Sequence, residues 1–487
     1  MSQQTSRTLQ QIPASHYRAR FLSTEALERK SNPIRSLFPL EQTPGLLSLL
    51  AGKPNPTTFP IASLSLSIRD PKSEIRNIQD EKAESDEAAD LVDIKLSKAE
   101  LEEALQYAEE GGVPKLMRWF STLQEKVHGR RCELYNQGTA CEGWKVTIGV
   151  GSQDVLYKAL KSILNDGDSV LVESPVYPGV LTVLHSSHSP QVEIQTDENG
   201  VSVSHLRSIL ESWPAGKPKP KVFYTVPTGS NPSGATATTE RKIEVLKLAQ
   251  EHDFLILEDD PYYYLYYAGT PQPPSYFALE ATLAEREGLQ VGRVVRFDSL
   301  SKILSAGMRI GWASGPEPII DAMVRCTASI NLQTPTLTQM ITYTLFSSPS
   351  WGHEGFLLHA SQVAAFYRRK CDIFETYMQK YLGAGNGNDG GALAKWEKPK
   401  AGMFYWFKII VDPSSVSSDG DSEALIRTKA FQNGVLALPG TVFLPGNEPR
   451  KTGYVRASFS LLHANEVEEA LKRLKKTILE AREELAT

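Results

Sequence analysis

Short apolar runs rich in β-branched residues alternate with amphipathic stretches over residues 100–340 of this 487-residue chain. Five of these runs are predicted to be buried strands: Val146–Ile148, Ser169–Val172, Val222–Val226, Phe254–Leu257 and Val294–Phe297. Between two of them, Glu240–His252 carries apolar residues at helical spacing. Alternating strands and helices predict an α/β domain with a mostly parallel sheet, in which ligands bind at the carboxyl ends of the strands.

The C-terminal third has a different pattern, with predicted strands at Met403–Ile410, Val435–Leu438 and Tyr454–Phe459 and a last helix at Asn465–Glu484. This pattern indicates a smaller α+β domain. We therefore expect an N-terminal segment (1–95) that contributes to the small domain and the substrate site, a large domain (96–345) and a C-terminal small domain (346–487). The charged stretch 73–93 and the glycine-rich stretch 383–391 are predicted to be insertions.

Composition argues against several classes of protein. The formal net charge is −5, and no lysine- or arginine-rich block suggests binding to nucleic acid or to a membrane surface. No run of 18 apolar residues predicts a transmembrane helix. The four cysteines are scattered without CxxC spacing, so we expect reduced thiols and neither a zinc site nor a disulfide framework.

The N-terminus lacks the apolar core of a secretory signal, so we expect a cytoplasmic protein. Arg7, Arg18 and Arg20 lie in a stretch without acidic residues, which leaves a mitochondrial presequence open.

A lysine follows the strand predicted at Val294–Phe297, in the segment Asp298-Ser299-Leu300-Ser301-Lys302, and Arg309 comes seven residues later. This arrangement suits a phosphorylated aldehyde cofactor, because the amine can form the imine while hydroxyls and a guanidinium hold the phosphate. Taken alone, the segment has a plain alternative, a surface lysine after a serine-rich turn.

The strand at Phe254–Leu257 ends in acidic residues and a tyrosine, Glu258-Asp259-Asp260-Pro261-Tyr262. Pyridoxal phosphate (PLP) needs a carboxylate at its pyridine nitrogen to stay protonated as an electron sink, and a phenol near the ring hydroxyl is favourable. The alternative is a helix N-cap followed by acidic residues in the first turn.

Three more predicted strands are followed by polar or aromatic residues that could contact such a cofactor. Asn231 is held between prolines and glycines in Pro227–Gly234, which makes it a preorganised hydrogen-bond donor. Ser152 and Gln153 follow glycines at a helix start, where backbone N–H groups bind anions. Tyr177 offers a ring for stacking. The alternative is a plain turn for the Asn231 segment and ordinary packing for Tyr177, but neither explains all of the motifs in this order.

This order of motifs resembles the fold-type I aminotransferases, and more narrowly the kynurenine/2-aminoadipate and fungal aromatic amino-acid aminotransferases. The resemblance extends from about Tyr17 to Leu474. It rests on the segments SNPIRSL, LLAGKPNPTTFP, ALQY, GGVPKL, GSQ, NPSG, EDDPYY, DSLSK, RIGW, AGMFYW and VRASFS. It implies the type I PLP-dependent transferase fold, PLP as cofactor, no metal, and a homodimer with shared active sites.

The resemblance also implies individual roles. Lys302 would carry PLP as a Schiff base and, once freed, would move the Cα proton, while Asp259 would pair with the pyridine nitrogen. Catalysis is thereby assigned to Lys302, Asp259 and Tyr262. The residues implied to bind the cofactor are Ser152, Gln153, Tyr177, Asn231, Asp259, Tyr262, Ser299, Ser301, Lys302, Arg309 and, at the neighbouring subunit's site, Tyr107.

For the substrate, the resemblance implies that Arg456 binds the α-carboxylate as a bidentate fork and that Asn231 assists. Arg35 and Gly52 would lie near the substrate side chain. Lys53 stands where relatives usually carry an apolar residue, and a second cation near Arg35 would favour an acidic side chain.

The reaction implied is transfer of the amino group of an aromatic L-amino acid to a 2-oxo acid such as 2-oxoglutarate, with ping-pong kinetics. Alternative readings are a 2-aminoadipate or kynurenine aminotransferase and a PLP lyase or decarboxylase of the same fold. A regulatory PLP-binding module and a homologue without activity are disfavoured. The chain shows no basic helix-turn-helix region before the PLP domain, and every expected catalytic residue type is present.

Overall fold

The computed structural model describes residues 9–30, 33–34, 37, 40–41, 43–50, 52–73, 75, 91–131, 143–388, 390–412, 420–446, 448 and 450–486. Its large domain is built on an eight-stranded sheet in the order β3-β10-β9-β8-β7-β4-β5-β6. The strands are β3 (Trp144–Val150), β4 (Val170–Ser174), β5 (Gln191–Asp197), β6 (Gly200–Val201), β7 (Val222–Thr225), β8 (Leu255–Asp259), β9 (Val294–Ser299) and β10 (Ile310–Pro316).

The centre of this sheet is parallel: β5, β4, β7, β8 and β9 run in the same direction, whereas β10 is antiparallel to both β9 and β3. All five strands predicted from apolar runs are present, within a few residues at their ends. Strands β5, β6 and β10 were not predicted. Every residue of β7 and of β8 is buried, which explains why these strands appear in the sequence as continuous apolar runs.

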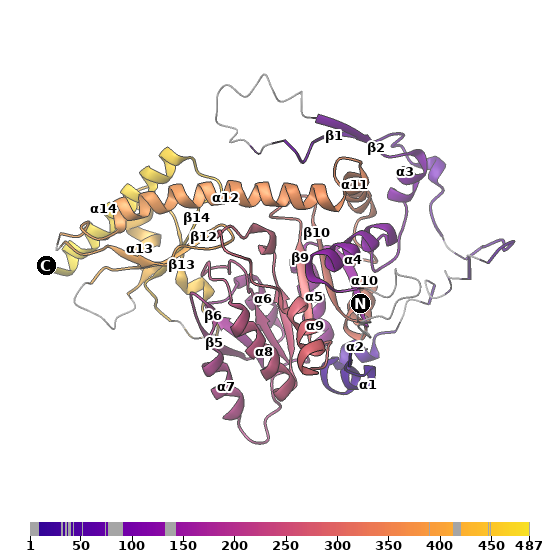
Figure 1. Cartoon of the computed structure of the whole chain (residues 1–487), viewed down its shortest axis with the longest axis horizontal. Coiled ribbons are helices and arrows are strands. Elements are labelled where there is room, and N and C mark those ends of the chain that lie inside the picture. The colour runs from indigo at the N-terminus through magenta and orange to yellow at the C-terminus, as the bar shows by residue number, and fades with distance from the viewer. Residues whose placement is uncertain are drawn as a thin grey trace, which may run out of the picture.

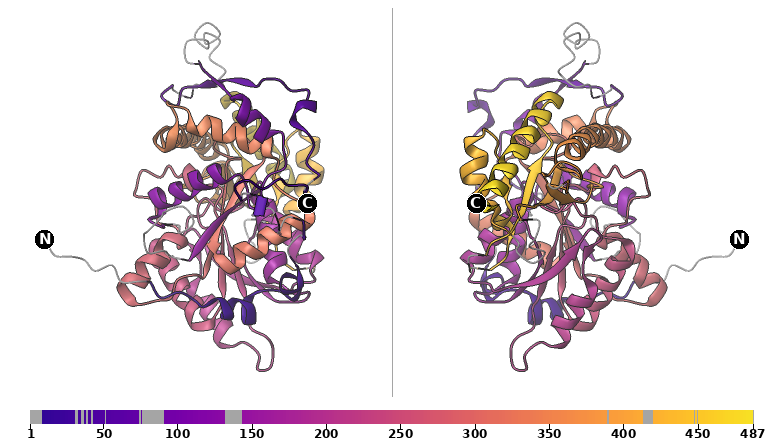
Figure 2. Two further views of the ribbon diagram at one scale, coloured as in Figure 1. Left: turned by 90° about the vertical axis from the view of Figure 1, so that its right-hand side faces the viewer. Right: turned by 90° about the vertical axis from the view of Figure 1, so that its left-hand side faces the viewer.

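Alternate residues of the strands point into two separate cores, one on each face of the sheet. Tyr224 and Leu257 belong to one core, Phe223 and Ile256 to the other. The first core is covered by α5 (Ser152–Ile163), α6 (Pro178–Ser186) and α10 (Glu317–Ile330), and the second by α4 (Pro114–His128), α7 (Val203–Glu211), α8 (Thr239–His252), α9 (Tyr276–Glu287) and α11 (Thr336–Ser347). Figure 2 shows these helices on both sides of the sheet.

The small domain contains an antiparallel sheet in the order β11-β12-β14-β13. Its elements are β11 (Ala394–Trp396), β12 (Phe404–Ile409), α13 (Ser422–Leu425), a π-helical turn (Ile426–Ala430), β13 (Leu438–Pro439), a 3-10 turn (Gly440–Phe443), β14 (Tyr454–Ser458) and α14 (Ala464–Ala486). The predicted strand Val435–Leu438 is therefore wrong over its first three residues. The predicted helix Asn465–Glu484 is confirmed as α14.

One long helix, α12 (Gly352–Leu382), runs from the large domain to the small one, where it packs beside α14 (Figure 1). Its 31 residues span about 46 Å. Buried apolar residues of α12 at its first turns join the core of the large domain, and those near its end join the core that includes the small domain. The helix therefore links the two domains without a loop.

The N-terminal part packs on the large domain. It includes α1 (Ala14–His16), a π-helical turn (Tyr17–Phe21) and α2 (Thr24–Glu28). The hydroxyl of Tyr17 donates to the carbonyl of Gly292 at 2.7 Å, and the backbone N–H of Ser23 donates to the carbonyl of Ser162 at 2.9 Å.

Beyond α2 the chain runs out from the body, past a 3-10 turn (Pro56–Thr58), before it returns to the antiparallel pair β1 (Ser65–Arg69) and β2 (Leu91–Lys95) and to α3 (Lys98–Ala104) (Figure 1). Most of the charged stretch 73–93, residues 74 and 76–90, lies outside the described residues. The division into three regions at 95 and 345 stays a prediction.

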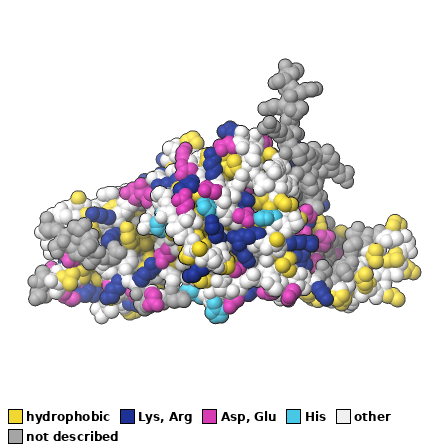
Figure 3. All heavy atoms as spheres, turned by 90° about the horizontal axis from the view of Figure 1, so that it is seen from below, with side chains coloured by type: hydrophobic (Ala, Val, Ile, Leu, Met, Phe, Trp, Pro, Cys, Tyr) yellow, Lys and Arg dark blue, Asp and Glu magenta, His cyan; other side chains and the backbone are white. Residues whose placement is uncertain are grey.

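Within the described residues, no helix has the length and apolar character needed to cross a membrane. On the face shown in Figure 3, Lys and Arg side chains gather near the middle, and Asp and Glu side chains lie around them. Ion pairs such as Arg207 with Glu211 and Lys247 with Glu287 recur on the surface.

Candidate active site

The carboxyl ends of β4, β7, β8 and β9 meet at a cavity of about 350 Å³ that lies between the two domains. Parallel sheets bind ligands at this edge. The predicted site residues that line the cavity are Ser152, Gln153, Tyr177, Asn231, Asp259, Tyr262, Ser299, Ser301, Lys302, Arg309 and Arg456. Residues that lie far apart in the sequence are thus brought together.

Two predicted site residues that the structure describes do not line this cavity, and a third cannot be placed. Tyr107 follows α3 and is 53% exposed, and Gly52 is exposed on the segment that runs out from the body. Arg35 lies outside the described residues. The resemblance places Tyr107 at a neighbouring subunit and the other two on the N-terminal segment, so a single chain does not test these assignments.

Asp259 is the last residue of β8 and is buried. Its Oδ2 accepts a hydrogen bond of 2.7 Å from the hydroxyl of Tyr224, while its Oδ1 is buried without a partner among the described residues. Burial raises the pKa of Asp259 to about 7, and the hydrogen bond from Tyr224 acts in the opposite direction. A buried carboxyl oxygen without a donor is costly, and a bound ring N–H would satisfy it.

Lys302 lies on the turn that follows β9 and is about half-buried. Burial lowers the pKa of its ammonium group, and the nearby cations Arg456 and Arg309 lower it further. A larger fraction of the amine is therefore neutral, which is the form that attacks a carbonyl.

An anion site lies where α5 begins at Ser152. The N-cap residue, Gly151, has φ +84° and provides no capping side chain, so the first N–H groups of the helix point out of it. Arg309 lies beside this helix start and is held there by two hydrogen bonds: it donates to the Ser301 hydroxyl at 3.3 Å and to the Val150 carbonyl at 3.2 Å. The φ of +84° at Gly151 is a backbone conformation that L side chains rarely adopt, and a Cβ there would also push against the guanidinium of Arg309, so glycine is favoured at this position.

Arg456 reaches the cavity from β14 of the small domain. Its Nη1 donates to Oδ1 of Asn231 at 2.8 Å, and its guanidinium carbon lies 4.2 Å from the ring centre of Phe404. Its Nε is buried without a partner among the described residues. A guanidinium fixed in this way has donors left for a carboxylate.

The structure adds residues to the site that the sequence did not reveal. Phe404, Val226, Pro261 and Ala306 line the cavity, and Tyr224 supports Asp259 from behind. Phe404 belongs to the AGMFYW segment, which carried the resemblance without a role for that ring. Nothing in the apolar run of β7 distinguishes Tyr224 from a core residue.

A buried ion cluster lies beneath these strand ends. The guanidinium of Arg296 on β9 contacts Glu258 at 3.3 Å, Asp260 at 3.0 Å and Asp298 at 2.7 Å, and all four side chains are buried. Burial raises the pKa of Glu258 and of Asp298, while Arg296 acts in the opposite direction. The cluster ties the end of β8 to the end of β9.

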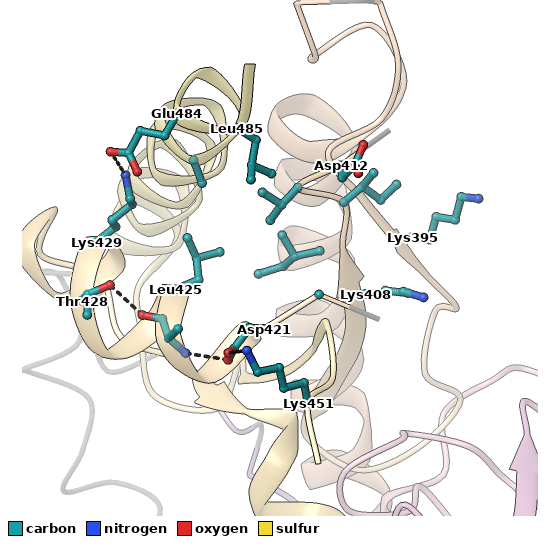
Figure 4. A pocket seen from close by; sticks show the side chains of 16 residues that line it. Lys395, Lys408, Asp412, Asp421, Leu425, Thr428, Lys429, Lys451, Glu484 and Leu485 are labelled. Carbon is teal, nitrogen blue, oxygen red and sulfur yellow. Dashed lines mark hydrogen bonds and ion pairs between the residues drawn. The ribbon is translucent and has the colours of Figure 1, made fainter. Parts of the chain in front are cut away.

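A second cavity, of about 910 Å³, lies in the small domain between the sheet, α13 and α14 (Figure 4). Two of the four lysines that line it are paired with acidic residues: Lys429 contacts Glu484, and Lys451 contacts Asp421 at 3.0 Å. None of the predicted site residues lines it. The chemically active side chains therefore gather in the smaller cavity.

Comparison with known proteins identifies the family. The model of the family "Aminotransferase class I and II" matches residues 130–474. The chain belongs to this family. It is 40% identical to "Aminotransferase tdiD" of Emericella nidulans over 91% of each protein. It is 34% identical to the mitochondrial kynurenine/alpha-aminoadipate aminotransferase of Bos taurus, over 95% of this chain and 99% of that protein.

Among solved structures, the aromatic aminotransferase Aro9 from C. albicans superposes with a TM-score of 0.77 at 26% identity, covering 94% of this chain and 97% of that one. These comparisons confirm the predicted resemblance, the type I fold and the classification as an aminotransferase. In the described residues, no three His, Cys, Asp or Glu side chains gather in a way that would hold a metal ion.

Proposed function

We propose that this aminotransferase uses PLP to move the amino group of an aromatic L-amino acid to a 2-oxo acid such as 2-oxoglutarate. The main support for this proposal is that four groups line one cavity. They are the amine of Lys302 with its lowered pKa, the buried carboxyl of Asp259 with one oxygen unpartnered among the described residues, the uncapped start of α5 beside Arg309, and the guanidinium of Arg456 from the small domain. PLP offers an aldehyde, a ring nitrogen and a phosphate, and its substrates offer a carboxylate, so each group has a partner.

The residues present fit the cofactor. Lys302 would hold its aldehyde carbon, Asp259 its ring nitrogen, and Tyr262 and Asn231 its ring hydroxyl. Ser152, Gln153, Ser299, Ser301 and Arg309 would hold its phosphate, with Tyr177 against the ring. When bound, PLP supplies the electron sink that stabilises negative charge at the substrate Cα.

The chain's own groups would do the remaining work. The amine of Lys302 would take up the proton of the substrate Cα and release it again, as general base and then acid. Arg456 binds the α-carboxylate and so fixes which face of Cα meets Lys302. The carboxylate of Asp259 keeps the ring nitrogen protonated during the transfer.

The cofactor assignment is tested by borohydride reduction of the yellow holoenzyme followed by peptide mapping. The pyridoxyl group is expected on Lys302, and Lys302→Ala is expected to lose both the visible absorption band and turnover. A pyridoxyl group on another lysine would contradict the assignment. A lyase or decarboxylase would release ammonia or CO₂ without consuming a 2-oxo acid, so product analysis separates these alternatives.

The aromatic preference is supported by the ring of Phe404 and by Val226 in the cavity wall. The relatives' names include aromatic, kynurenine and aminoadipate aminotransferases. Lys53 lies 3.5 Å from the carboxylate of Glu41, whose pKa is lowered mainly by the Ser48 hydroxyl and also by Lys53. Because Glu41 neutralises much of the charge of Lys53, we propose that Lys53 adds little preference for an acidic side chain.

A matched pair of variants tests this preference. Wild type, Lys53→Leu and Glu41→Gln are compared by kcat/KM for phenylalanine, tyrosine, tryptophan, kynurenine and 2-aminoadipate. We expect the aromatic donors to be preferred, Lys53→Leu to change none of the values more than about twofold, and Glu41→Gln to raise kcat/KM for 2-aminoadipate. A selective loss of 2-aminoadipate activity in Lys53→Leu would place that charge in the substrate pocket.

We further propose a homodimer. The segment that runs out from the body exposes a row of apolar side chains, with Leu47 96% and Leu49 104% exposed. Several large apolar side chains exposed within a few residues are costly in water and are typical of an interface. Light scattering coupled to gel filtration should give twice the chain mass. Leu47→Ser with Leu49→Ser should shift the protein toward the monomer, whereas Leu485→Ser, on the exposed end of α14, should not.

For the compartment we propose the cytoplasm, with the mitochondrion as the alternative because the name of the bovine relative includes it. Imaging of the full chain with a C-terminal fluorescent tag distinguishes the two.

A further inference from the structure

Tyr224 lies behind Asp259 on the neighbouring parallel strand. Tyr224 on β7 is opposite Leu257 on β8, and Asp259, two residues further along β8, faces the same side of the sheet. The ring of Tyr224 is fully buried and its hydroxyl donates to Oδ2 of Asp259 at 2.7 Å. Tyr224 is not among the residues that line the cavity, so it acts on a ligand only through Asp259.

We propose that Tyr224 is a positioning residue that fixes both the orientation and the charge of Asp259 for binding the ring nitrogen of PLP; this inference rests on the proposed cofactor. The hydrogen bond occupies Oδ2 and thereby stops the carboxyl group from rotating. Oδ1, the oxygen without a partner among the described residues, is then the one available to the cofactor.

The hydrogen bond also decides where a shared proton resides. A carboxylate and a ring nitrogen in contact share one proton, and the stronger base holds it. Burial raises the pKa of Asp259 to about 7, Asp260 and Asp298 raise it further, and Tyr224 and Arg296 oppose that rise. Tyr177 and Tyr262 also face this group. Loss of the Tyr224 donor leaves Asp259 a stronger base, which draws the proton away from the ring and weakens the electron sink.

Tyr276 provides a matched control. It is as deeply buried as Tyr224, but it belongs to the core on the other face of the sheet, and its hydroxyl has no partner among the described residues. Tyr224→Phe and Tyr276→Phe both remove one buried hydroxyl and keep the ring. Only the first is expected to affect the cofactor.

The experiment is a double-mutant cycle on PLP affinity. Cofactor-free wild type, Tyr224→Phe, Tyr276→Phe, Asp259→Asn and the Tyr224→Phe/Asp259→Asn double variant are titrated with PLP. Tyr224→Phe is expected to weaken PLP binding about ten- to a hundredfold, the factor for losing a hydrogen bond to a charged group. Its kcat should fall while the KM for the amino donor changes little, because Arg456 is intact. Tyr276→Phe should behave as wild type.

The decisive comparison is the double variant, because a hydroxyl that acts through Asp259 has no further effect once Asp259 is an amide. Wild-type affinity in Tyr224→Phe, or an equal loss in the Asp259→Asn background, overturns the proposal. If Asp259→Asn itself binds PLP and turns over as wild type does, the proposed role of Asp259 fails instead. The ¹⁵N chemical shift of ring-labelled PLP gives a second readout, since Tyr224→Phe should move it toward the unprotonated value.

Discussion

At the scale of single residues, the buried carboxyl of Asp259 gives the cofactor-free protein a specific pH dependence. Its folded-state pKa is raised to about 7, above its unfolded value, so it contributes stability below pH 4 that is lost as pH rises through about 7. The free energy of unfolding of wild type minus that of Asp259→Asn should therefore fall by up to about 4 kcal/mol between pH 4 and 7. Urea unfolding of both cofactor-free proteins at several pH values measures this difference in unfolding free energy. A difference that does not change with pH would contradict the raised pKa of Asp259.

A second prediction at this scale concerns Arg456, whose proposed partner is the carboxylate common to every substrate. Arg456→Ala should weaken all amino acids and 2-oxo acids similarly, by about 2–5 kcal/mol for a charge pair removed from water. Steady-state kcat/KM values for one aromatic, one acidic and one aliphatic donor measure the loss. A loss confined to one class of side chain would mean that Arg456 recognises the side chain instead.

At the scale of elements, the ion cluster joins β8 to β9, the two strands that end in Asp259 and Ser299. Arg296→Met would leave Glu258, Asp260 and Asp298 buried without their counter-ion, which should cost about 3–5 kcal/mol of unfolding free energy at neutral pH. The loss should shrink at low pH, where the carboxyls take up protons. Arg207→Met, at an exposed ion pair with Glu211, is the control and should change stability by less than about 0.5 kcal/mol.

The same strands show what the sequence could and could not predict. Continuous apolar runs identified β7, β8 and β9, and the residues after them gave Asn231, Asp259 and Lys302. Strand β10 was not predicted because Gly311 and Gly315 interrupt its apolar pattern and because it runs against the parallel order. Tyr224 was not predicted because its contact depends on β7 and β8 being neighbours in register, which no local pattern reveals.

At the scale of the whole molecule, the cavity is assembled from two domains. Lys302 and Asp259 come from the large domain, whereas Arg456 and Phe404 come from the small one. The contact of Arg456 with Asn231 links them directly, and so does the hydrogen bond of 2.9 Å from the backbone N–H of Val176 to the carbonyl of Phe443. Sequence motifs predicted the site residues of both domains. They could not predict that β14 contacts the loop after β7, because that contact depends on how the two domains pack.

This division has a consequence for substrates that lack a carboxylate. A carboxylate bound to Arg456 attaches the small domain to a ligand held by the large domain, so binding energy from a group that does not react helps to bring the domains together. An amine that has the side chain of a substrate amino acid but no α-carboxylate cannot bind Arg456, so it lacks this binding energy. It is therefore expected to react slowly even when it saturates the enzyme, and a separately added small carboxylate, such as formate or acetate, should restore part of its rate.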